Sequence, residues 1–206
     1  FSRRVQSMVT LSRTVRTNAP SAFASAVGRK TYRARIASAS RRAIGSPRGD
    51  VSEMGAARFF RRTGEGVYDM ADLARATAKM AGFVEAILAQ HPGRRAYGFG
   101  YSNGANILAS VMIARPDLFD RVGLLHPLIP WQPTPAPGLQ GRKVLITAGR
   151  NDPICPWPLT ESLSGWVTAQ GADLATSYHD GGHELRREEL GALASLLRGA
   201  AQTGAV

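Results

Sequence analysis

Apolar side chains first recur at helical spacing in a segment that begins at Asp69 or Asp72 and ends at Gln90. Asp72 and Glu85 fall on one face of that helix, and the His-Pro-Gly sequence at 91–93 stops it. The opposite face carries Leu73, Ala76, Met80, Phe83, Val84, Ile87 and Leu88. The pattern predicts an amphipathic helix whose apolar face packs on a core.

Further along the chain, short apolar runs alternate with longer segments of helical pattern. The short runs predict strands at 95–99, 122–126, 143–149 and 172–178. The longer segments predict helices at 105–114, 159–170 and 184–197. Strands that alternate with helices are typical of an α/β fold, so we expect a mostly parallel sheet with helices on both faces.

The chain between residues 43 and 66 has a weaker pattern. Residues 43–50 are typical of a strand end that runs into a turn, and residues 53–66 are typical of a loop. Phe59 and Phe60 stand side by side in this polar loop, and we expect them to anchor it in the core.

Charge divides the chain in two. The net charge of the 206 residues is +11, but residues 1–49 contain 11 of the 26 basic residues and none of the 15 acidic ones. Residues 50–206 therefore carry 15 charges of each sign, so the basic balance concerns only the N-terminal part. Residues 1–42 are rich in Arg, Ser, Ala and Thr and show no clear strand or helix period.

Three interpretations of residues 1–42 remain open. An Arg- and Ser-rich segment without acids is typical of a presequence. It could also be a disordered basic tail that binds nucleic acid or an anionic membrane. The third interpretation is that the segment is not native to the domain, for example because it derives from a shifted reading frame.

The segment 100–104, Gly-Tyr-Ser-Asn-Gly, has the Gly-x-Ser-x-Gly spacing of a nucleophile elbow. It lies between a predicted strand and a predicted helix, which is the order that the elbow requires. Glycines two residues before and after Ser102 allow the strand and the helix to approach closely. Ser102 would then stand exposed at the apex, with the backbone amide of Asn103 placed to bind an oxyanion.

A serine needs a base and an orienting acid to become a nucleophile. In folds with such an elbow, the acid and then the histidine follow the serine in the chain. Asp152 comes directly after the strand at 143–149, and His183 comes shortly after the strand at 172–178. His179 and Asp180 are alternatives, although Asp180 is only three residues from His183. We therefore predict Ser102, Asp152 and His183 as a catalytic triad. His126 lies too early for this order and would line the pocket.

Other site classes find little support. The single cysteine, Cys155, excludes an internal disulfide and fits a reducing compartment, so we expect a cytoplasmic location. His179 and His183 lie on a Gly-Gly turn rather than on a helix, and we expect no metal site. The glycines at 98, 100 and 104 lack the spacing of a dinucleotide fingerprint, and we expect no cofactor. No apolar run approaches the roughly 18 residues of a membrane span.

Four segments resemble the phospholipase/carboxylesterase family of α/β-hydrolases, which includes acyl-protein thioesterase-like and dienelactone-hydrolase-like serine esterases. They are Gly-Tyr-Ser-Asn-Gly-Ala-Asn-Ile at 100–107, Leu-His-Pro-Leu-Ile-Pro at 125–130, Ala-Gly-Arg-Asn-Asp-Pro at 148–153 and His-Asp-Gly-Gly-His-Glu-Leu at 179–185. Ser-Pro-Arg-Gly at 46–49 and Arg-Phe-Phe-Arg-Arg at 58–62 are also similar. The resemblance spans about residues 43–199 and leaves 200–206 as a tail.

The resemblance implies a serine carboxylesterase that hydrolyses short-chain or aryl esters through an acyl-enzyme. It makes four residues candidates for the substrate pocket: Phe59, Phe60, Leu128 and Trp131. The implied partner is a small-molecule ester, with no nucleic acid and no transmembrane segment, and a homodimer is left open.

Residues 1–42 depart from the family pattern. The family has a strand followed by a Leu-His-Gly-x-Gly-Gly type loop, which donates the second oxyanion amide. No His-Gly or Gly-Gly pair occurs before residue 43, and no clear strand precedes it. The N-terminal strands are therefore expected to be missing or replaced, which favours a discontinuity near residue 43. The alternatives are a catalytically impaired hydrolase and a basic segment that binds nucleic acid or membrane.

Overall fold

The computed structural model describes residues 7–13 and 43–198. This part of the chain contains a six-stranded sheet with the strand order β10-β9-β8-β7-β1-β2. Its strands are β1 (Ser7–Arg13), β2 (Ala43–Gly45), β7 (Arg94–Tyr101), β8 (Arg121–Leu125), β9 (Lys143–Gly149) and β10 (Asp173–His179). The helices are α1 (Met70–Gln90), α2 (Asn103–Ala114), α3 (Trp157–Ala169) and α4 (Arg187–Arg198), with a short 3-10 turn at Pro137–Leu139.

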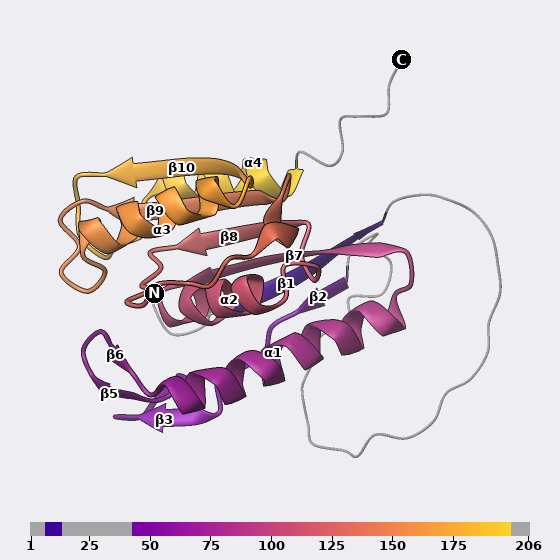
Figure 1. Ribbon diagram of the computed structural model, residues 1–206, viewed down its shortest axis with the longest axis horizontal. Coiled ribbons are helices and arrows are strands. Elements are labelled where there is room, and N and C mark those ends of the chain that lie inside the picture. The colour runs from indigo at the N-terminus through magenta and orange to yellow at the C-terminus, as the bar shows by residue number, and fades with distance from the viewer. Residues whose placement is uncertain (1–6, 14–42, 199–206) are drawn as a thin grey trace.

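Strands β7 to β10 run parallel, and helices cover both faces of this part of the sheet. Helix α2 contacts β7 and β8, and α3 contacts β9 and β10. Helix α4 packs on the opposite face, where Leu193 joins Leu125 and Leu145 in a separate apolar cluster. Figure 1 shows α2 and α3 on one side of the sheet and α4 on the other. The predicted α/β fold is confirmed.

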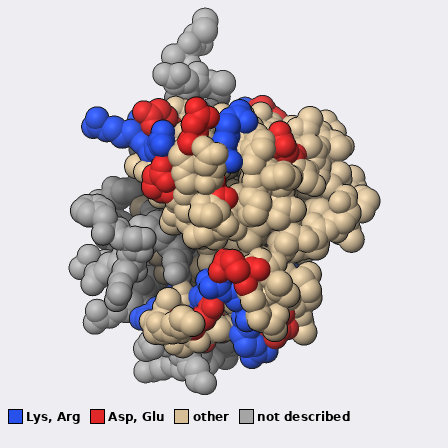
Figure 2. All heavy atoms as spheres, turned by 90° about the vertical axis from the view of Figure 1, so that its left-hand side faces the viewer, with Lys and Arg blue, Asp and Glu red and all other residues tan. Residues whose placement is uncertain are grey.

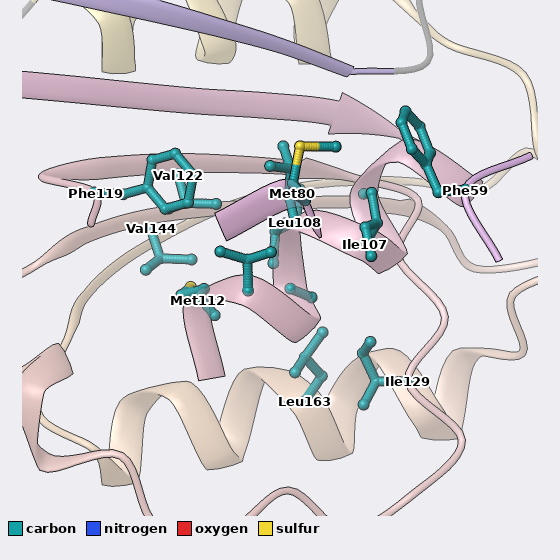
Figure 3. Packing of buried hydrophobic residues seen from close by; sticks show 14 of the residues in the cluster. Phe59, Met80, Ile107, Leu108, Met112, Phe119, Val122, Ile129, Val144 and Leu163 are labelled. Atoms are coloured by element: carbon teal, nitrogen blue, oxygen red, sulfur yellow. The ribbon is translucent and has the colours of Figure 1, made fainter. Parts of the chain in front are cut away.

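The main core lies between the sheet and helices α1, α2 and α3. All five residues of β8 are buried, as expected for a parallel strand that is covered on both faces. Figure 3 shows Met80, from α1, next to Leu108, from α2, so the two helices share one apolar layer. Each fully buried side chain of this size stabilises the fold by about 1.5–3 kcal/mol.

Helix α1 agrees with the predicted helix in its bounds but not in the exposure of Asp72. The side chain of Asp69 caps the helix by accepting a hydrogen bond from the Asp72 amide at 3.0 Å. Asp72 was expected on the solvent face, yet it is only 3% exposed. It accepts hydrogen bonds from the Arg61 amide at 2.7 Å and from Arg75 at 2.7 Å, which compensate for its burial.

The predicted loop at 53–66 contains short hairpins that the sequence pattern did not indicate. β3 (Val51–Glu53) pairs with β4 (Ala56–Arg58), and β5 (Arg62–Gly64) pairs with β6 (Val67–Tyr68). Phe59 and Phe60 lie between the two hairpins and are 5% and 0% exposed. The expectation that these two rings anchor the segment in the core is confirmed.

The N-terminal part also differs from the expectation that no strand precedes residue 43. Ser7–Arg13 forms β1, which pairs antiparallel with β7 on one side and with β2 on the other. Strand β7 would otherwise present an open edge, and the seven residues of β1 satisfy its backbone hydrogen bonds. The local sequence pattern is weak here, and the pairing of β1 with β7 and β2 defines the strand instead. The expectations for residues 14–42 and 200–206 lie outside the described residues.

Within the described part of the chain, no helix is both long enough and apolar enough to cross a membrane.

Candidate active site

The predicted elbow joins β7 to α2, and Ser102 stands at its apex. Ser102 has φ 53° and ψ −120°, a conformation that L-residues rarely adopt. A Cβ on Gly100 would lie 2.4 Å from the carbonyl carbon of Gly104, so only glycine allows this approach. The Ser102 amide donates a hydrogen bond to the Leu125 carbonyl at 2.9 Å, which ties the elbow to β8.

Two loops at the carboxyl ends of neighbouring strands bring a carboxylate and an imidazole to this serine. Asp152 follows β9, and His183 follows β10. His183 Nε2 lies 2.9 Å from Ser102 Oγ, and His183 Nδ1 lies 2.7 Å from Asp152 Oδ2. Ser102 and Asp152 precede His183 by 81 and 31 residues in the chain, and the fold places the three side chains in one hydrogen-bonded row.

Asp152 is 4% exposed and has hydrogen-bond partners on both oxygens. Its Oδ1 accepts from the amides of Ile154 at 2.8 Å and Cys155 at 3.0 Å. Its Oδ2 accepts from His183 and also from His126 Nδ1 at 2.9 Å. Burial opposes the charge, but the hydrogen bonds from His126, from the two amides and from His183 outweigh it and lower the pKa of Asp152.

The sequence suggested that His126 lines the pocket. In the structure His126 is instead fully buried behind Asp152. Its Nε2 lies 3.0 Å from Glu189 Oε1, so the ring is held between two carboxylates. Glu189, on α4, is 1% exposed and was missed by sequence reasoning. The sequence could have indicated Glu189, because it is an acidic residue on the face of the predicted helix that packs on the core.

His179 and Tyr101 complete this group of side chains around Asp152. His179 Nδ1 accepts from the Gly181 amide at 3.0 Å, so its Nε2 carries the hydrogen and faces Glu189 Oε2 at 3.3 Å. The Tyr101 hydroxyl donates to the His183 carbonyl, and the two rings are 5.2 Å apart. Burial, followed by the nearby Asp152 charge, raises the pKa of Tyr101 to about 12.

Asn103 opens helix α2, and its side chain connects the elbow to the Phe59 segment. The Asn103 backbone amide belongs to the first turn of α2, where amides have no partner within the helix. Its side-chain Oδ1 accepts a hydrogen bond from the Phe59 amide at 2.9 Å. Two of the pocket candidates, Phe59 and Phe60, are therefore fixed next to the elbow but buried.

The other two pocket candidates lie on the Pro-rich loop after β8. Leu128 is 4% exposed, and its amide donates to the Asn106 side chain at 2.7 Å. Asn106 also donates to the Tyr68 hydroxyl at 2.7 Å, which in turn donates to the Leu128 carbonyl at 2.9 Å. Trp131 is partly buried, with its ring 6.0 Å from that of Tyr68. Of the four candidates, Trp131 alone keeps substantial exposed surface.

Two groups of side chains among the described residues have donor atoms close enough for a metal ion. They are His126 with His179 and Glu189, and His126 with Asp152 and His183. His126 is hydrogen-bonded to a carboxylate in each group, and His183 is hydrogen-bonded to Asp152 in the second. We therefore treat His126, Asp152, His183 and Glu189 as one hydrogen-bonded network.

The chain is similar in sequence to a known hydrolase and in structure to solved α/β proteins. The chain is 37% identical to the putative hydrolase MhqD of Bacillus subtilis (strain 168) over 144 residues, which are 69% of this chain and 72% of that protein. It is 54% identical to Atu2452, of unknown function, from Agrobacterium tumefaciens str. C58, with a TM-score of 0.70 over 75% of this chain and 76% of that one. The Bacillus cereus carboxylesterase is 31% identical, with a TM-score of 0.70 and coverage of 81% and 79%. No protein-family model matches.

The parallel sheet, the elbow and these relatives define an α/β-hydrolase of the esterase type. The chain belongs to the phospholipase/carboxylesterase family, and it is an enzyme of the hydrolase class.

Proposed function

We propose that the protein is a serine carboxylesterase in which Ser102 is the nucleophile, His183 the general base and acid, and Asp152 the residue that orients His183. One observation carries this proposal: His183 is hydrogen-bonded to Ser102 Oγ through one nitrogen and to Asp152 through the other, at 2.9 Å and 2.7 Å. This is the geometry in which an imidazole removes the serine proton while a carboxylate holds its tautomer.

The proposed reaction has two halves. His183 takes the proton of Ser102 Oγ as that oxygen attacks the ester carbonyl, and the tetrahedral intermediate collapses when His183 gives the proton to the leaving alcohol. A water molecule then attacks the acyl-enzyme, with its proton going to His183 and onward to Ser102. The products are the alcohol, released in the first half, and the carboxylic acid, released in the second with the free enzyme.

The Asn103 backbone amide would bind the oxyanion that forms in each half. Its position in the first turn of α2 leaves its hydrogen free of helix partners, and the helix dipole adds positive potential there. Donors of this kind contribute about 10²–10³ in rate where one has been removed.

Small, uncharged esters suit this site best. Apart from the 3-10 turn, only the irregular Pro-rich loop connects β8 to β9, which leaves little chain for a lid over a long acyl group. Figure 2 looks onto the side of the molecule toward which β8 and β10 point. Charged side chains gather there in two separate areas, with uncharged surface between them. We infer a short-chain or aryl ester, with Trp131 at the pocket.

The test is hydrolysis of p-nitrophenyl acetate by the full chain and by Ser102→Ala. We expect the substitution to lower kcat/KM at least about a thousandfold, because it removes the hydroxyl that is hydrogen-bonded to His183 Nε2. Ser110→Ala is the matched control, since Ser110 lies on the same helix and its hydroxyl bonds to Thr77 at 2.7 Å. It should retain activity within about threefold. Equal activity of Ser102→Ala and the unmodified chain would refute the serine mechanism.

A further inference from the structure

The buried row of polar side chains continues beyond Asp152. The order of contacts is Ser102, His183, Asp152, His126 and Glu189. A carboxylate and an imidazole are enough to activate a serine, so His126 and Glu189 are additional. Both side chains are essentially without solvent contact, at 0% and 1% exposure. Buried polar groups of this kind are costly unless their hydrogen bonds are complete.

The protonation state of His126 follows from its partners. A neutral imidazole carries a hydrogen on one nitrogen only, but both nitrogens of His126 face carboxylate oxygens, at 2.9 Å and 3.0 Å. Either the ring carries two hydrogens, or one carboxylate carries a proton. The second arrangement is disfavoured by the other donors: Asp152 accepts three further hydrogen bonds, and Glu189 Oε2 accepts one from the Arg186 amide at 2.6 Å.

We propose that His126 is a positioning residue for the esterase reaction. Protonated on both nitrogens and held between Asp152 and Glu189, it fixes the Asp152 oxygen that orients His183 and takes up part of its negative charge. This inference rests on the proposed roles of Ser102, Asp152 and His183, and it adds a cation to them.

The electrostatic balance of the group agrees with this arrangement. Burial opposes a charge on His126, but its hydrogen bonds with Glu189 and Asp152 outweigh burial and raise the pKa of His126. Burial likewise opposes the charge on Glu189, and the hydrogen bond with His126 is the largest of the opposing effects that lower the pKa of Glu189. An imidazolium between two carboxylates leaves a net charge of −1 in place of two uncompensated anions.

A charged His126 also has a consequence for His183, because the two rings are 5.2 Å apart. Two imidazolium ions at this distance repel each other, so His126 opposes the protonation that would inactivate His183 as a base. The titratable groups that face His126 come from every element around it: Tyr101 on β7, Asp152 and Cys155 after β9, His179 on β10, His183 after β10 and Glu189 on α4.

The kinetic test is the pH profile of kcat/KM for p-nitrophenyl acetate, measured with His126→Asn. Asparagine is chosen because His126 has φ 50°, which asparagine tolerates better than most residues. We expect kcat/KM at pH 7 to fall about tenfold or more, and the acidic limb of the profile to move to higher pH by about half a unit to one unit. Loss of packing alone would lower the rate and the Tm without moving the limb.

Cys155→Ala is the matched control for packing. The Cys155 thiol is 1% exposed and donates to the His126 carbonyl at 3.3 Å, while its amide bond to Asp152 does not depend on the side chain. This variant should lower the Tm but leave the acidic limb within about 0.2 pH unit of the unmodified chain. A limb that stays in place in His126→Asn as well would overturn the proposal.

The protonation state of His126 can also be measured directly in the unmodified protein, without a substitution at this position. Nitrogen-15 NMR of the histidine rings in the unmodified protein should show both nitrogens of His126 protonated at pH 7. In Glu189→Gln, the loss of one carboxylate should move the His126 titration to lower pH. A neutral His126 ring at pH 7 would overturn the proposal even if Ser102→Ala is inactive. An active Ser102→Ala would refute the serine mechanism and leave this NMR result standing.

Discussion

At the scale of single residues, the elbow depends on Gly100 as much as on Ser102. Ser102 adopts a strained conformation because β7 and α2 meet at a very short turn, and that turn exists only where Gly100 touches the backbone of Gly104. The strain places the hydroxyl 2.9 Å from His183 Nε2. A change at Gly100 should therefore affect stability and catalysis together.

We predict that Gly100→Ala lowers the free energy of unfolding by about 2–4 kcal/mol and reduces kcat/KM at least about tenfold. The added Cβ would lie 2.4 Å from backbone atoms of Gly104, which cannot move without shifting Ser102. Urea denaturation and p-nitrophenyl acetate hydrolysis measure the two effects.

Gly191→Ala is the control for this prediction. Gly191 lies within α4, and a Cβ there would meet nothing within 4 Å. Alanine in an exposed helix position should stabilise the protein by about 0.5–1 kcal/mol and leave activity unchanged. If both alanine variants were equally stable, close contact at the elbow would not be the cause.

The sequence predicted the residues of the site that follow strands, and missed those that act through tertiary contacts. Ser102, Asp152 and His183 could be proposed because each lies in a loop directly after a strand, in the order of an α/β-hydrolase, and the structure brings their side chains together. Glu189 lies 63 residues from His126, and no local pattern relates the two. Asp72 was placed on the wrong face, because its partner Arg61 belongs to a segment without regular spacing.

At the scale of elements, one side chain holds three of them together near the site. Asn106, in α2, donates to the Tyr68 hydroxyl in β6 and accepts from the Leu128 amide in the Pro-rich loop. The segment at 105–114 was predicted as a helix, and the buried Asn106 within it forms a structural connection that the pattern did not indicate. The loop that carries Trp131 thus depends on a hydrogen bond to α2.

We predict that Asn106→Ala lowers the free energy of unfolding by about 2–4 kcal/mol. The substitution leaves the buried Leu128 amide without its partner, and such a group costs about 1–3 kcal/mol in addition to the lost contacts. Tyr68→Phe removes the neighbouring hydroxyl but keeps the Asn106–Leu128 bond, so it should cost less. Chemical denaturation of both variants measures the difference, and a larger loss in Tyr68→Phe would contradict this explanation.

The elements themselves were predicted most accurately where the pattern was long and repetitive. The helices α1 and α3 and the strand β9 agree with their predicted positions within two residues, because their apolar periodicity is set by a packed core. Strand β1 and the hairpins β3–β4 and β5–β6 were not predicted. The hairpin strands are short, and all of these strands lie outside the parallel part of the sheet, where the partner strand rather than the local sequence determines the structure.

At the scale of the whole molecule, charge is balanced in ion clusters along the described surface after residue 49. One of them joins the start of the domain to α1: Asp50 lies 3.0 Å from Arg75 and 2.5 Å from Lys79. Burial favours the neutral acid, but hydrogen bonds and the charges of Arg75 and Lys79 lower the pKa of Asp50 from 3.8 to about 2. The net charge of the chain gives no indication of this cluster.

Because its pKa is lowered in the folded state, Asp50 stabilises the protein at neutral pH and less so in acid. The stabilisation is complete above the unfolded value of 3.8 and is lost as the pH falls through the folded value of about 2. We therefore predict that Asp50→Asn lowers the Tm at pH 7 and that its difference from the unmodified chain shrinks as the pH approaches 2. Because Asp50 is partly exposed, added salt should also reduce the difference at pH 7.

Thermal unfolding from pH 7 to pH 2 tests this prediction, with Asp173→Asn as the control. Asp173 pairs with Lys143 at 2.7 Å and its side chain is 60% exposed, so solvent screens the pair. That variant should change the Tm by less than about 1 °C at any pH. A Tm difference for Asp50→Asn that stays constant down to pH 2 would mean that the side chain acts through its shape, because only a charge-dependent contribution disappears when the carboxylate is protonated.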